Sequence, residues 1–519
     1  MDVYSGWKST CRAIFGEEIG ELDAFRSYLL EYHYPCVKGK SAISGKDVAL
    51  SSSRYCKGAS VISQDEVNFE KKYAPLSINE IKDIDSLLSA LSDRFYYCGN
   101  KIFSNSKFVE GSDNCDDSFF VKDSHTIVSS KYVAYSSFIR ENCSSVYGCV
   151  GLMDSSNIIR GTGLHNSRNF ESIHCFNSSD MLFAYYCAGC TQCMFSFNLR
   201  SKKYCIGNLE LPKGKYLEMR EKLAKEVAAE LREKKRFHPI FDFAAPTPQE
   251  IGRIGMPRFA KKPADGKRLE EAFRKTSALV LGKELEGVRA HEKFLSGHSP
   301  KTMSLPSAFG NECGYSDYFS GKNVPKERLV TVEESRRMAQ ECFPVEEEDS
   351  VHDIVRKMGR LAFYCSEIKE ENSANNTETP LEYGAQDCHR VAVATHSRRS
   401  AYAAHLQRCD AVFGSGMLMV DSSFCLRCHN CVKVTCSMDL DSCTNCARSY
   451  FCHNCENVHD SMFCFNTKNL SYAIGNVEVG REQYMEAKKM LLDNIASQLK
   501  EKSTIGIDIC SMGCNWKGN

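Results

Sequence analysis

MFSFNLRSKKYCIGNLELPKGKY, residues 194–216, and MFCFNTKNLSYAIGNVEVGREQY, residues 462–484, align without a gap and share 10 of 23 residues. The same register continues upstream and pairs further identical residues: Cys175 with Cys443, Phe183 with Phe451, and Cys187 with Cys455. With a slip of one position, FYYC at 95–98 matches AFYC at 362–365, and a helix-like stretch precedes each. Self-similarity over this span predicts a tandem duplication.

A finer repeat lies within each copy. From Asn105 the chain reads NSKFVEG, SDNCD, DSFFVK, DSHTIVS, SKYVAY, SSFIRE, short units that open with small polar residues and continue with aromatic or β-branched ones. Short strands between such corners predict a parallel β-solenoid. In the second copy Asp-Ser pairs begin at Asp421, Asp441 and Asp460, a nearly constant spacing that fits three such units and so predicts three units per turn.

An amphipathic helix is expected to follow each solenoid. The first places one apolar stripe at Tyr216, Leu223, Val227 and Leu231, and the second repeats it at Tyr484, Leu491, Ile495 and Leu499. The open end of a solenoid exposes unpaired edges and apolar rungs, so we expect each helix to cap its own solenoid. Docking of these helices on another subunit is the alternative.

The predicted fold class is therefore α+β: two tandem parallel β-solenoids (β-helices), each followed by an amphipathic capping helix, joined by a Pro/Gly linker and a helical middle region. A first short helix is expected near 16–32, another helix over 330–349, and a polar loop over 367–380. The expected organisation is 1–94, an N-terminal region with short helices; 95–211, solenoid copy 1; 212–237, capping helix 1; 238–266, extended linker; 267–382, helical middle region and polar loop; 383–479, solenoid copy 2; 480–503, capping helix 2; and 504–519, C-terminal tail.

The composition is that of a soluble globular protein. Of 519 residues, 66 are Lys or Arg and 66 are Asp or Glu, so a net charge of zero gives no long-range field for nucleic acid or an anionic membrane. No signal peptide and no membrane span are expected, because no basic segment precedes an apolar run and no stretch approaches 18 apolar residues. The 28 cysteines then predict a cytoplasmic protein with mostly free thiols used as core material.

Nine cysteines lie between Cys425 and Cys464, including C-x-x-C pairs that begin at 425, 443 and 452. Two such pairs at this spacing are typical of a zinc site. The duplication argues against it, since metal ligands should recur in both copies. Instead Cys190, Cys193 and Cys205 fall on Val458, Ser461 and Ala473, and Cys446, Cys452 and Cys464 fall on Ser178, Ala184 and Ser196. Exchange among small residues favours a packed interior; a zinc or iron–sulfur site confined to the second copy stays the alternative.

Other catalytic motifs are missing from the sequence. It contains no phosphate loop, no H-E-x-x-H and no nucleophile elbow. His165 and His174 are expected to be corner residues rather than bases. We therefore assign no catalytic, cofactor-binding or metal-ligating residues and predict no cofactor, with zinc as the lesser alternative.

CTQCMFSFNLRSKKYCIGNLELPKGKYLEMREKL, residues 190–223, resembles uncharacterised cysteine-rich β-solenoid repeat proteins of uncultivated bacteria and archaea and of large phages. The matching residues are Cys190, Cys193, Leu199, Arg200, Lys202, Tyr204, Cys205, Ile206, Asn208 and Tyr216. The second copy keeps Tyr472, Ile474, Asn476 and Tyr484 of this pattern. The resemblance covers less than half of the chain and implies a solenoid without a known activity. The zinc ribbon of many members has no counterpart here, because the N-terminal region lacks paired cysteines.

The leading interpretation is a non-enzymatic structural or scaffolding protein that mediates protein–protein assembly, for example in a virus particle or a large cytoplasmic complex. Its expected partners are other protein subunits, in a homo- or hetero-oligomer, with no specific nucleic acid and no membrane. One alternative is a metal-binding module at Cys425–Cys464. A second is a hexapeptide-type acyltransferase, which requires a histidine base and a regular aliphatic hexad, whereas many of those positions here are Phe, Tyr or Cys.

Overall fold

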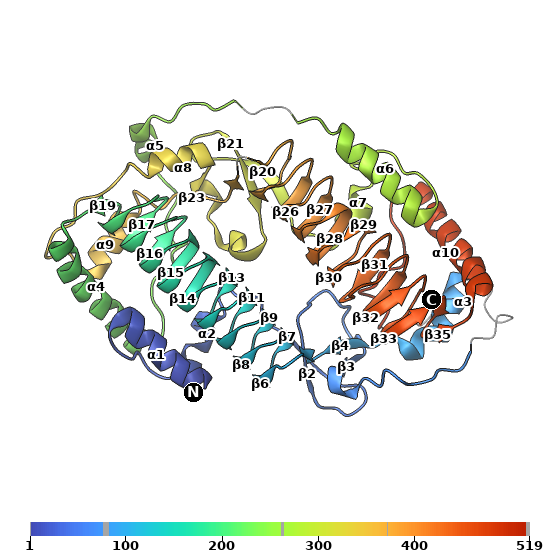
Figure 1. The fold of residues 1–519 in the computed structure, drawn as a ribbon. Coiled ribbons are helices and arrows are strands. Elements are labelled where there is room, and N and C mark those ends of the chain that lie inside the picture. Colours follow the sequence, from blue (N-terminus) through green and yellow to red (C-terminus); the bar gives the residue numbers. More distant parts are fainter. Residues whose placement is uncertain (1, 76–82, 261–263, 371, 515–519) are drawn as a thin grey trace.

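The computed structural model describes residues 2–75, 83–260, 264–370 and 372–514. Its fold is mixed α+β and is dominated by two long parallel sheets, one of 15 strands and one of 10 (Figure 1). Both sheets are compatible with the two solenoid-like units that the sequence predicts. Parts of the predicted linker (261–263), polar loop (371) and tail (515–519) lie outside the described residues.

The first sheet, stack 1, runs over residues 102–210. Its strands are β5 (Ile102–Phe103), β6 (Lys107–Glu110), β7 (Asp113–Asp116), β8 (Phe119–Lys122), β9 (His125–Val128), β10 (Lys131–Ala134), β11 (Ser137–Arg140), β12 (Ser144–Tyr147), β13 (Val150–Met153), β14 (Ser156–Leu164), β15 (Ser167–Phe176), β16 (Ser179–Tyr185), β17 (Thr191–Phe197), β18 (Lys203–Ile206) and β19 (Leu209–Glu210).

The second sheet, stack 2, begins at Ile368, so the segment predicted as a polar loop holds its first strand. Its strands are β24 (Ile368–Lys369), β25 (Leu381–Tyr383), β26 (His389–Thr395), β27 (Ala401–Gln407), β28 (Asp410–Val420), β29 (Ser423–Leu426), β30 (Cys431–Val432), β31 (Met438–Asp441), β32 (Tyr450–His459) and β33 (Phe465–Ser471).

The same short interval separates paired residues in both stacks. Lys107 pairs with Phe119 and Phe119 with Lys131 in stack 1. In stack 2, Leu381 pairs with Val393 and Val393 with His405. The prediction of three short units per turn is therefore wrong: two short units, not three, separate one strand from its parallel neighbour.

A left-handed backbone conformation at about every third residue accounts for this shorter interval. In the first strands of stack 1, φ is positive at Phe108, Gly111, Asn114, Asp117, Phe120, Asp123, Thr126, Ser129, Tyr132 and Tyr135. Each such residue bends the chain, so four bends fit between paired residues. The conformation costs about 1–2 kcal/mol for a side chain with a Cβ, and the ladder of interstrand hydrogen bonds holds it in place.

Both stacks end in the same way. A short antiparallel hairpin closes each one, β18 with β19 in stack 1 and β34 (Ala473–Ile474) with β35 (Val477–Glu478) after stack 2. Asn208 completes the first end because its side-chain amide bonds both backbone groups of Phe197, at 2.9 and 3.0 Å. Asn476 makes the same two bonds to Phe465, at 2.9 and 2.7 Å. The predicted equivalence of Asn208 and Asn476 is confirmed.

A 22-residue helix follows each hairpin: α4 (Lys213–Lys234) after stack 1 and α10 (Arg481–Lys502) after stack 2. The predicted apolar faces are confirmed as buried: Tyr216, Leu223, Val227 and Leu231 in α4, and Tyr484, Leu491, Ile495 and Leu499 in α10. The linker is not wholly extended, because it contains the short helix α5 (Pro248–Ile254), which begins at a Thr247–Glu250 capping box.

The elements before each stack are also duplicated. They correspond in the order α1 (Val3–Phe15) with α6 (Lys267–Leu281), α2 (Arg26–Leu29) with α7 (Glu292–Leu295), hairpin β1 (Val37–Lys40)–β2 (Asp47–Leu50) with β20 (Thr302–Pro306)–β21 (Glu312–Ser316), β3 (Val61–Ser63) with β22 (Leu329–Val330), α3 (Ile84–Leu91) with α9 (Val351–Met358), and β4 (Tyr97–Gly99) with β23 (Tyr364–Cys365). We call residues 3–234 repeat 1 and residues 267–502 repeat 2.

Two helix predictions need correction. The helix expected near 16–32 lies earlier, as α1, which ends at Gly16 with φ at 84°. Within that range only a short 3-10 turn, Leu22–Phe25, and the one-turn helix α2 form. The helix expected over 330–349 begins at a Thr331–Glu334 capping box but ends early, as α8 (Val332–Met338).

The two repeats exchange their leading parts. Residues 37–98, lead segment 1, share a buried apolar cluster with repeat 2, which brings together Leu88, Phe95 and Tyr97 with Phe465 and Tyr484. Residues 302–365, lead segment 2, share the other large cluster with repeat 1. Figure 1 shows the result: β4 and α3 lie beside the end of stack 2 and α10, while β23 lies beside the end of stack 1.

Equivalent hydrogen bonds hold both exchanged segments. The Asn198 side chain donates to the Phe363 carbonyl at 3.2 Å, and Asn466, its counterpart in repeat 2, donates to the Tyr96 carbonyl at 2.7 Å. The polypeptide therefore closes on itself with an approximate internal two-fold relation, as in an isologous dimer.

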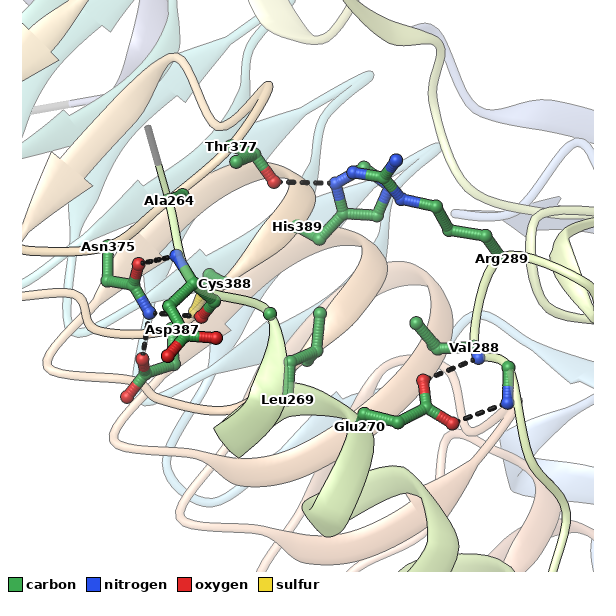
Figure 2. A pocket seen from close by; sticks show the side chains of 13 residues that line it. Ala264, Leu269, Glu270, Val288, Arg289, Asn375, Thr377, Asp387, Cys388 and His389 are labelled. Carbon is green, nitrogen blue, oxygen red and sulfur yellow. Dashed lines mark hydrogen bonds between the residues drawn. The ribbon is translucent and has the colours of Figure 1, made fainter. Parts of the chain in front are cut away.

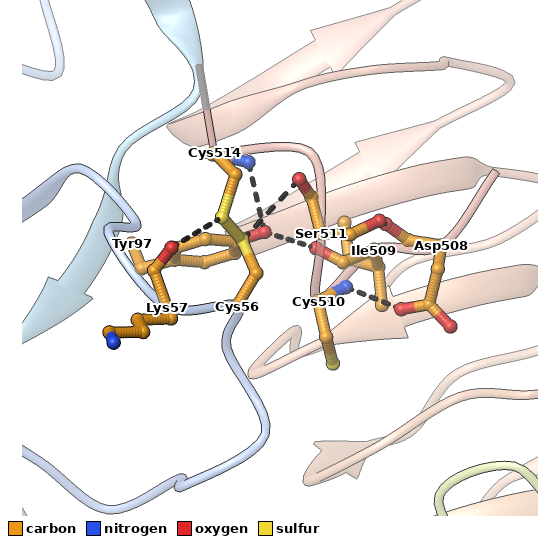
Figure 3. The surroundings of a disulfide bond; sticks show 9 residues. Cys56, Lys57, Tyr97, Asp508, Ile509, Cys510, Ser511 and Cys514 are labelled. Carbon is orange, nitrogen blue, oxygen red and sulfur yellow. Dashed lines mark hydrogen bonds between the residues drawn. A yellow bond between two sulfur atoms is a disulfide. The ribbon is translucent and has the colours of Figure 1, made fainter. Parts of the chain in front are cut away.

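One disulfide joins lead segment 1 to the C-terminal tail. Cys56 of lead segment 1 is bonded to Cys514 across 458 residues of sequence, beside Tyr97, whose hydroxyl donates to the Ile509 carbonyl at 2.6 Å (Figure 3). The other 26 cysteines are free, in agreement with the prediction of mostly free thiols. The disulfide pair itself was not predicted from the sequence.

Candidate functional site

The cysteines between Cys425 and Cys464 lie inside stack 2. Within stack 2, about every third residue points into the interior of the stack. A C-x-x-C pair therefore occupies two consecutive interior positions. Cys425, Cys428 and Cys431 form one such run, and each is completely buried. The predicted burial of Cys446, Cys452 and Cys464 is confirmed, since none is more than 1% exposed. The spacing typical of zinc ligands thus also arises from three-residue inward periodicity.

Thiols and hydroxyls make the same hydrogen bonds at these inward positions. The Ser124 hydroxyl donates to the Lys122 carbonyl at 2.7 Å and accepts the Ser136 amide at 3.0 Å. The Cys431 thiol donates to the His429 carbonyl at 3.0 Å and accepts the Cys443 amide at 3.4 Å. Cysteine and serine can therefore replace one another without leaving a buried backbone group unpaired, which explains their exchange between the repeats.

Burial raises the pKa of Cys431 to about 11 and that of Cys443 to about 12. Cys452 differs, because hydrogen bonds with Cys455 and Cys464 outweigh burial and lower its pKa. A protonated thiol is a poor nucleophile. Among the residues that the structure describes, the three side chains that could share one metal ion are His298, Asp508 and Cys510, which lie outside this tract.

His165 and His174 occupy corners of stack 1, as predicted, with φ at 54° and 52°. His165 is exposed and lies 3.8 Å from the Asp154 carboxylate. The His174 ring makes a 3.1 Å hydrogen bond with the Ser320 hydroxyl, and burial lowers its pKa to about 4. Sequence reasoning missed Ser320, because no motif marks this residue of the middle region.

The outer surface of stack 1 carries an aromatic ladder that the sequence analysis did not single out. Phe108, Phe120 and Tyr132 occupy one corner of successive strands, with stacked rings 4.6 and 5.2 Å apart. Phe108, at the open end of the ladder, is 68% exposed, more than any other large apolar side chain that the structure describes. The regular recurrence of the three aromatics along the chain is the signal that could have revealed this ladder.

The same corner of stack 2 is polar. Asn375, Asp387 and Arg399 stand where repeat 1 has Phe108, Phe120 and Tyr132, and Asn375 and Arg399 also have positive φ. The Asn375 side chain bonds Asp387 and both backbone groups of Asp265, the latter at 2.6 Å each (Figure 2). This first strand region is thus covered, and beside it lies a pocket of about 360 Å³ that includes Glu270 and His389.

Strand β6, one of the two terminal strands at the start of stack 1, has an open edge. Strand β6 pairs with β8 on one side and, in the described part of the chain, with nothing on the other. A hollow of about 560 Å³ separates it from the β1–β2 hairpin, with Val109 and Ile102 in its lining. Ile102 is 42% exposed. An unprotected edge next to exposed apolar side chains is the typical setting for strand pairing with another chain.

Comparison with known proteins adds no function. No family model matches the chain, and no curated protein or solved structure matches it significantly. In the described residues no helix is both long enough and apolar enough to span a bilayer.

Proposed function

We propose that the protein is a non-enzymatic structural subunit built from two β-solenoids, and that it assembles with a second copy of itself through the open end of stack 1. The nearly constant interval between paired residues, the inward periodicity of three and the duplicated end caps support the solenoid assignment. The exposed ring of Phe108 at the end of the aromatic ladder is the observation that carries the assembly role.

The edge strand favours a copy of the same chain as partner. Strand β6 reads Lys-Phe-Val-Glu from Lys107 to Glu110. In an antiparallel pair of two such strands about a two-fold axis at Phe108, each Phe108 faces the other chain's Phe108. This pairing brings together the two exposed rings and covers both open edges. A single interface therefore covers both the apolar surface and the unpaired backbone groups.

Measurement of the solution mass by light scattering tests this proposal. We expect a dimer of the 58.4 kDa chain, and we expect Phe108→Asn to shift it to the monomer. Asparagine is the residue that repeat 2 carries at this corner, and it tolerates positive φ, so the variant should fold. Leu279→Glu is the matched control, because Leu279 on α6 is 49% exposed and lies away from this edge.

A monomer at every accessible concentration would overturn the assembly role. So would a dimer that survives Phe108→Asn, since another surface would then hold it.

A further inference from the structure

A group of polar side chains, of which Cys510 is buried and His298 and Asp508 are half-buried, lies where the tail passes over stack 2. His298 follows α7, and Asp508 and Cys510 lie two positions apart on the tail (Figure 3). One ligand atom from each residue can be chosen so that all three lie within 4.8 Å of one another. The His298 Nε2 is 2.6 Å from an Asp508 oxygen, and the other Asp508 oxygen accepts the Cys510 amide at 2.7 Å.

Arg427 and Asp439 of stack 2 lie beside this group. Their equivalents in repeat 1, Arg160 and Glu171, are fully paired. Arg160 Nε lies 2.6 Å from Glu171, and both side chains are completely buried. Glu171 also accepts hydrogen bonds from the Tyr32 hydroxyl and, at 3.2 Å, from the Ile240 amide. A second carboxylate, that of Glu31, lies 3.0 Å from Arg160. Repeat 1 therefore uses this corner as a closed structural contact.

Repeat 2 replaces this contact by a longer and incomplete one. Arg427 and Asp439 stand at the positions of Arg160 and Glu171, but the closest approach of the two charged groups is 3.4 Å. Asp439 is completely buried, and within the described residues neither of its oxygens accepts a well-formed hydrogen bond. The Ile509 amide lies near enough to lower the pKa of Asp439, against the larger effect of burial. Arg427 bonds Asp508 instead. A buried carboxylate without hydrogen bonds is costly, and burial raises the pKa of Asp439 to about 8.

We propose that His298, Asp508 and Cys510 bind a zinc ion, and that Arg427 then moves from Asp508 to Asp439, the place that Arg160 takes beside Glu171 in repeat 1. Imidazole, carboxylate and thiolate are a ligand set suited to zinc, whereas calcium and magnesium require oxygen ligands. The charges balance: Zn²⁺ meets one carboxylate and one thiolate, and Arg427 meets the Asp439 carboxylate. The protons of the Cys510 thiol and of Asp439 leave to solvent.

The surroundings suit a preformed site with access from solvent. The tail is held by the Cys56–Cys514 disulfide and by Tyr97, so Asp508 and Cys510 are in place before any ion binds. His298 also lines a hollow of about 580 Å³, together with Tyr34, Arg54 and Lys322. An ion can enter through this hollow and keep a water molecule as its fourth ligand.

Metal titration of the purified full-length chain tests the proposal. After treatment with a chelator, we expect one equivalent of zinc to bind in competition with a chromogenic chelator. Cobalt substitution should give a near-ultraviolet thiolate-to-metal charge-transfer band. Cys510→Ser should abolish the band, while Cys446→Ser, a buried thiol of stack 2, should leave it unchanged. Near-ultraviolet circular dichroism of each variant checks that the fold persists.

A separate variant tests the handover, that is, the movement of Arg427 from Asp508 to Asp439. Asp439→Asn should weaken zinc binding at least tenfold, because Arg427 then stays on Asp508. Unchanged affinity in this variant would refute the handover. A cobalt band that survives Cys510→Ser, a band lost in Cys446→Ser, or no bound zinc at all would overturn the site.

Discussion

At one corner of the two stacks, repeat 1 carries the stacked rings of Phe108, Phe120 and Tyr132, with Phe108 exposed, whereas repeat 2 has Asn375, which hydrogen-bonds Asp387 and, in the preceding segment, Asp265. The two repeats share the order of their elements and their end caps, so the backbone does not account for this difference. Inward positions also differ, for example Cys190 and Val458, but their side chains stay buried in both repeats. The difference at this corner changes the surface of the stack without altering its ladder.

The buried corner of each repeat shows the same principle. In repeat 1 the Arg160–Glu171 contact is complete, and in repeat 2 the Arg427–Asp439 contact is left open. At each of these two corners, one repeat makes a closed contact that stabilises the fold. The other repeat leaves groups there that are available to bind a ligand or a partner. Four experiments break or sharpen this comparison.

The buried acids should give the largest difference. Glu171→Ala leaves the Tyr32 hydroxyl, the Ile240 amide and part of the Arg160 charge without an acceptor, so we expect a loss of about 3–5 kcal/mol in the free energy of unfolding. Asp439→Ala removes a carboxylate without hydrogen bonds and should cost less than about 1 kcal/mol or stabilise the metal-free protein. Urea unfolding followed by circular dichroism measures both. Equal losses of unfolding free energy would show that the Glu171 and Asp439 carboxylates stabilise the fold to the same extent.

The end caps should respond alike. Asn208→Gly and Asn476→Gly keep the positive φ of each position but remove the amide that pairs with Phe197 or Phe465. Each variant should lose about 1–3 kcal/mol of unfolding free energy, because buried backbone groups are left unpaired. Hydrogen exchange of the Phe197 and Phe465 amides reports the local effect. A large loss in one repeat alone would contradict the equivalence of the caps.

Exchange of inward residues between the repeats should be mild. Cys446→Ser and Cys452→Ala introduce the residues that repeat 1 has at the same places, Ser178 and Ala184. We expect about 1 kcal/mol for each, since volume is nearly conserved and the serine hydroxyl can make the thiol's hydrogen bonds. Thermal unfolding checks this cost. Losses of several kcal/mol, with unfolding of stack 2 by a chelator, would instead indicate metal ligands.

Acidification should weaken both repeats to a similar degree. Burial lowers the pKa of His125 and His174 in repeat 1 to about 4, and that of His389 and His405 in repeat 2 to about 4 and 3. An unfolded histidine binds its proton near pH 6.5, so between pH 4 and 6.5 the unfolded chain holds more protons. Stability therefore falls as pH drops through this window and is complete above it.

Neutral substitutions test this sign. His174→Gln and His405→Gln should each make the urea midpoint at pH 5 closer to that at pH 7.5. A midpoint difference that grows after substitution would show that these histidines are charged in the folded protein.

Much of the regular structure could be predicted from the sequence. The alignment of Met194–Tyr216 with Met462–Tyr484 identified both end caps, and the 3.6-residue periodicity identified α4 and α10. The interval between paired residues could not be predicted, because aromatic residues such as Phe108 and Tyr132 rarely adopt positive φ and so do not resemble corner residues. The candidate zinc ligands escaped notice as well, since 210 residues separate His298 from Asp508.

The sequence by itself determined the duplication, the use of cysteine as interior material, and the ends of both stacks. Each of these features depends on side chains that recur at fixed intervals along the chain. Residues with such a regular spacing meet the same local hydrogen bonding and burial. Only the tertiary structure decided the exchange of lead segments 1 and 2, the Cys56–Cys514 disulfide, and the difference between the two Arg–acid corners. Those contacts join segments far apart in the sequence, and they depend on the fit of surfaces that exist only once both stacks have formed.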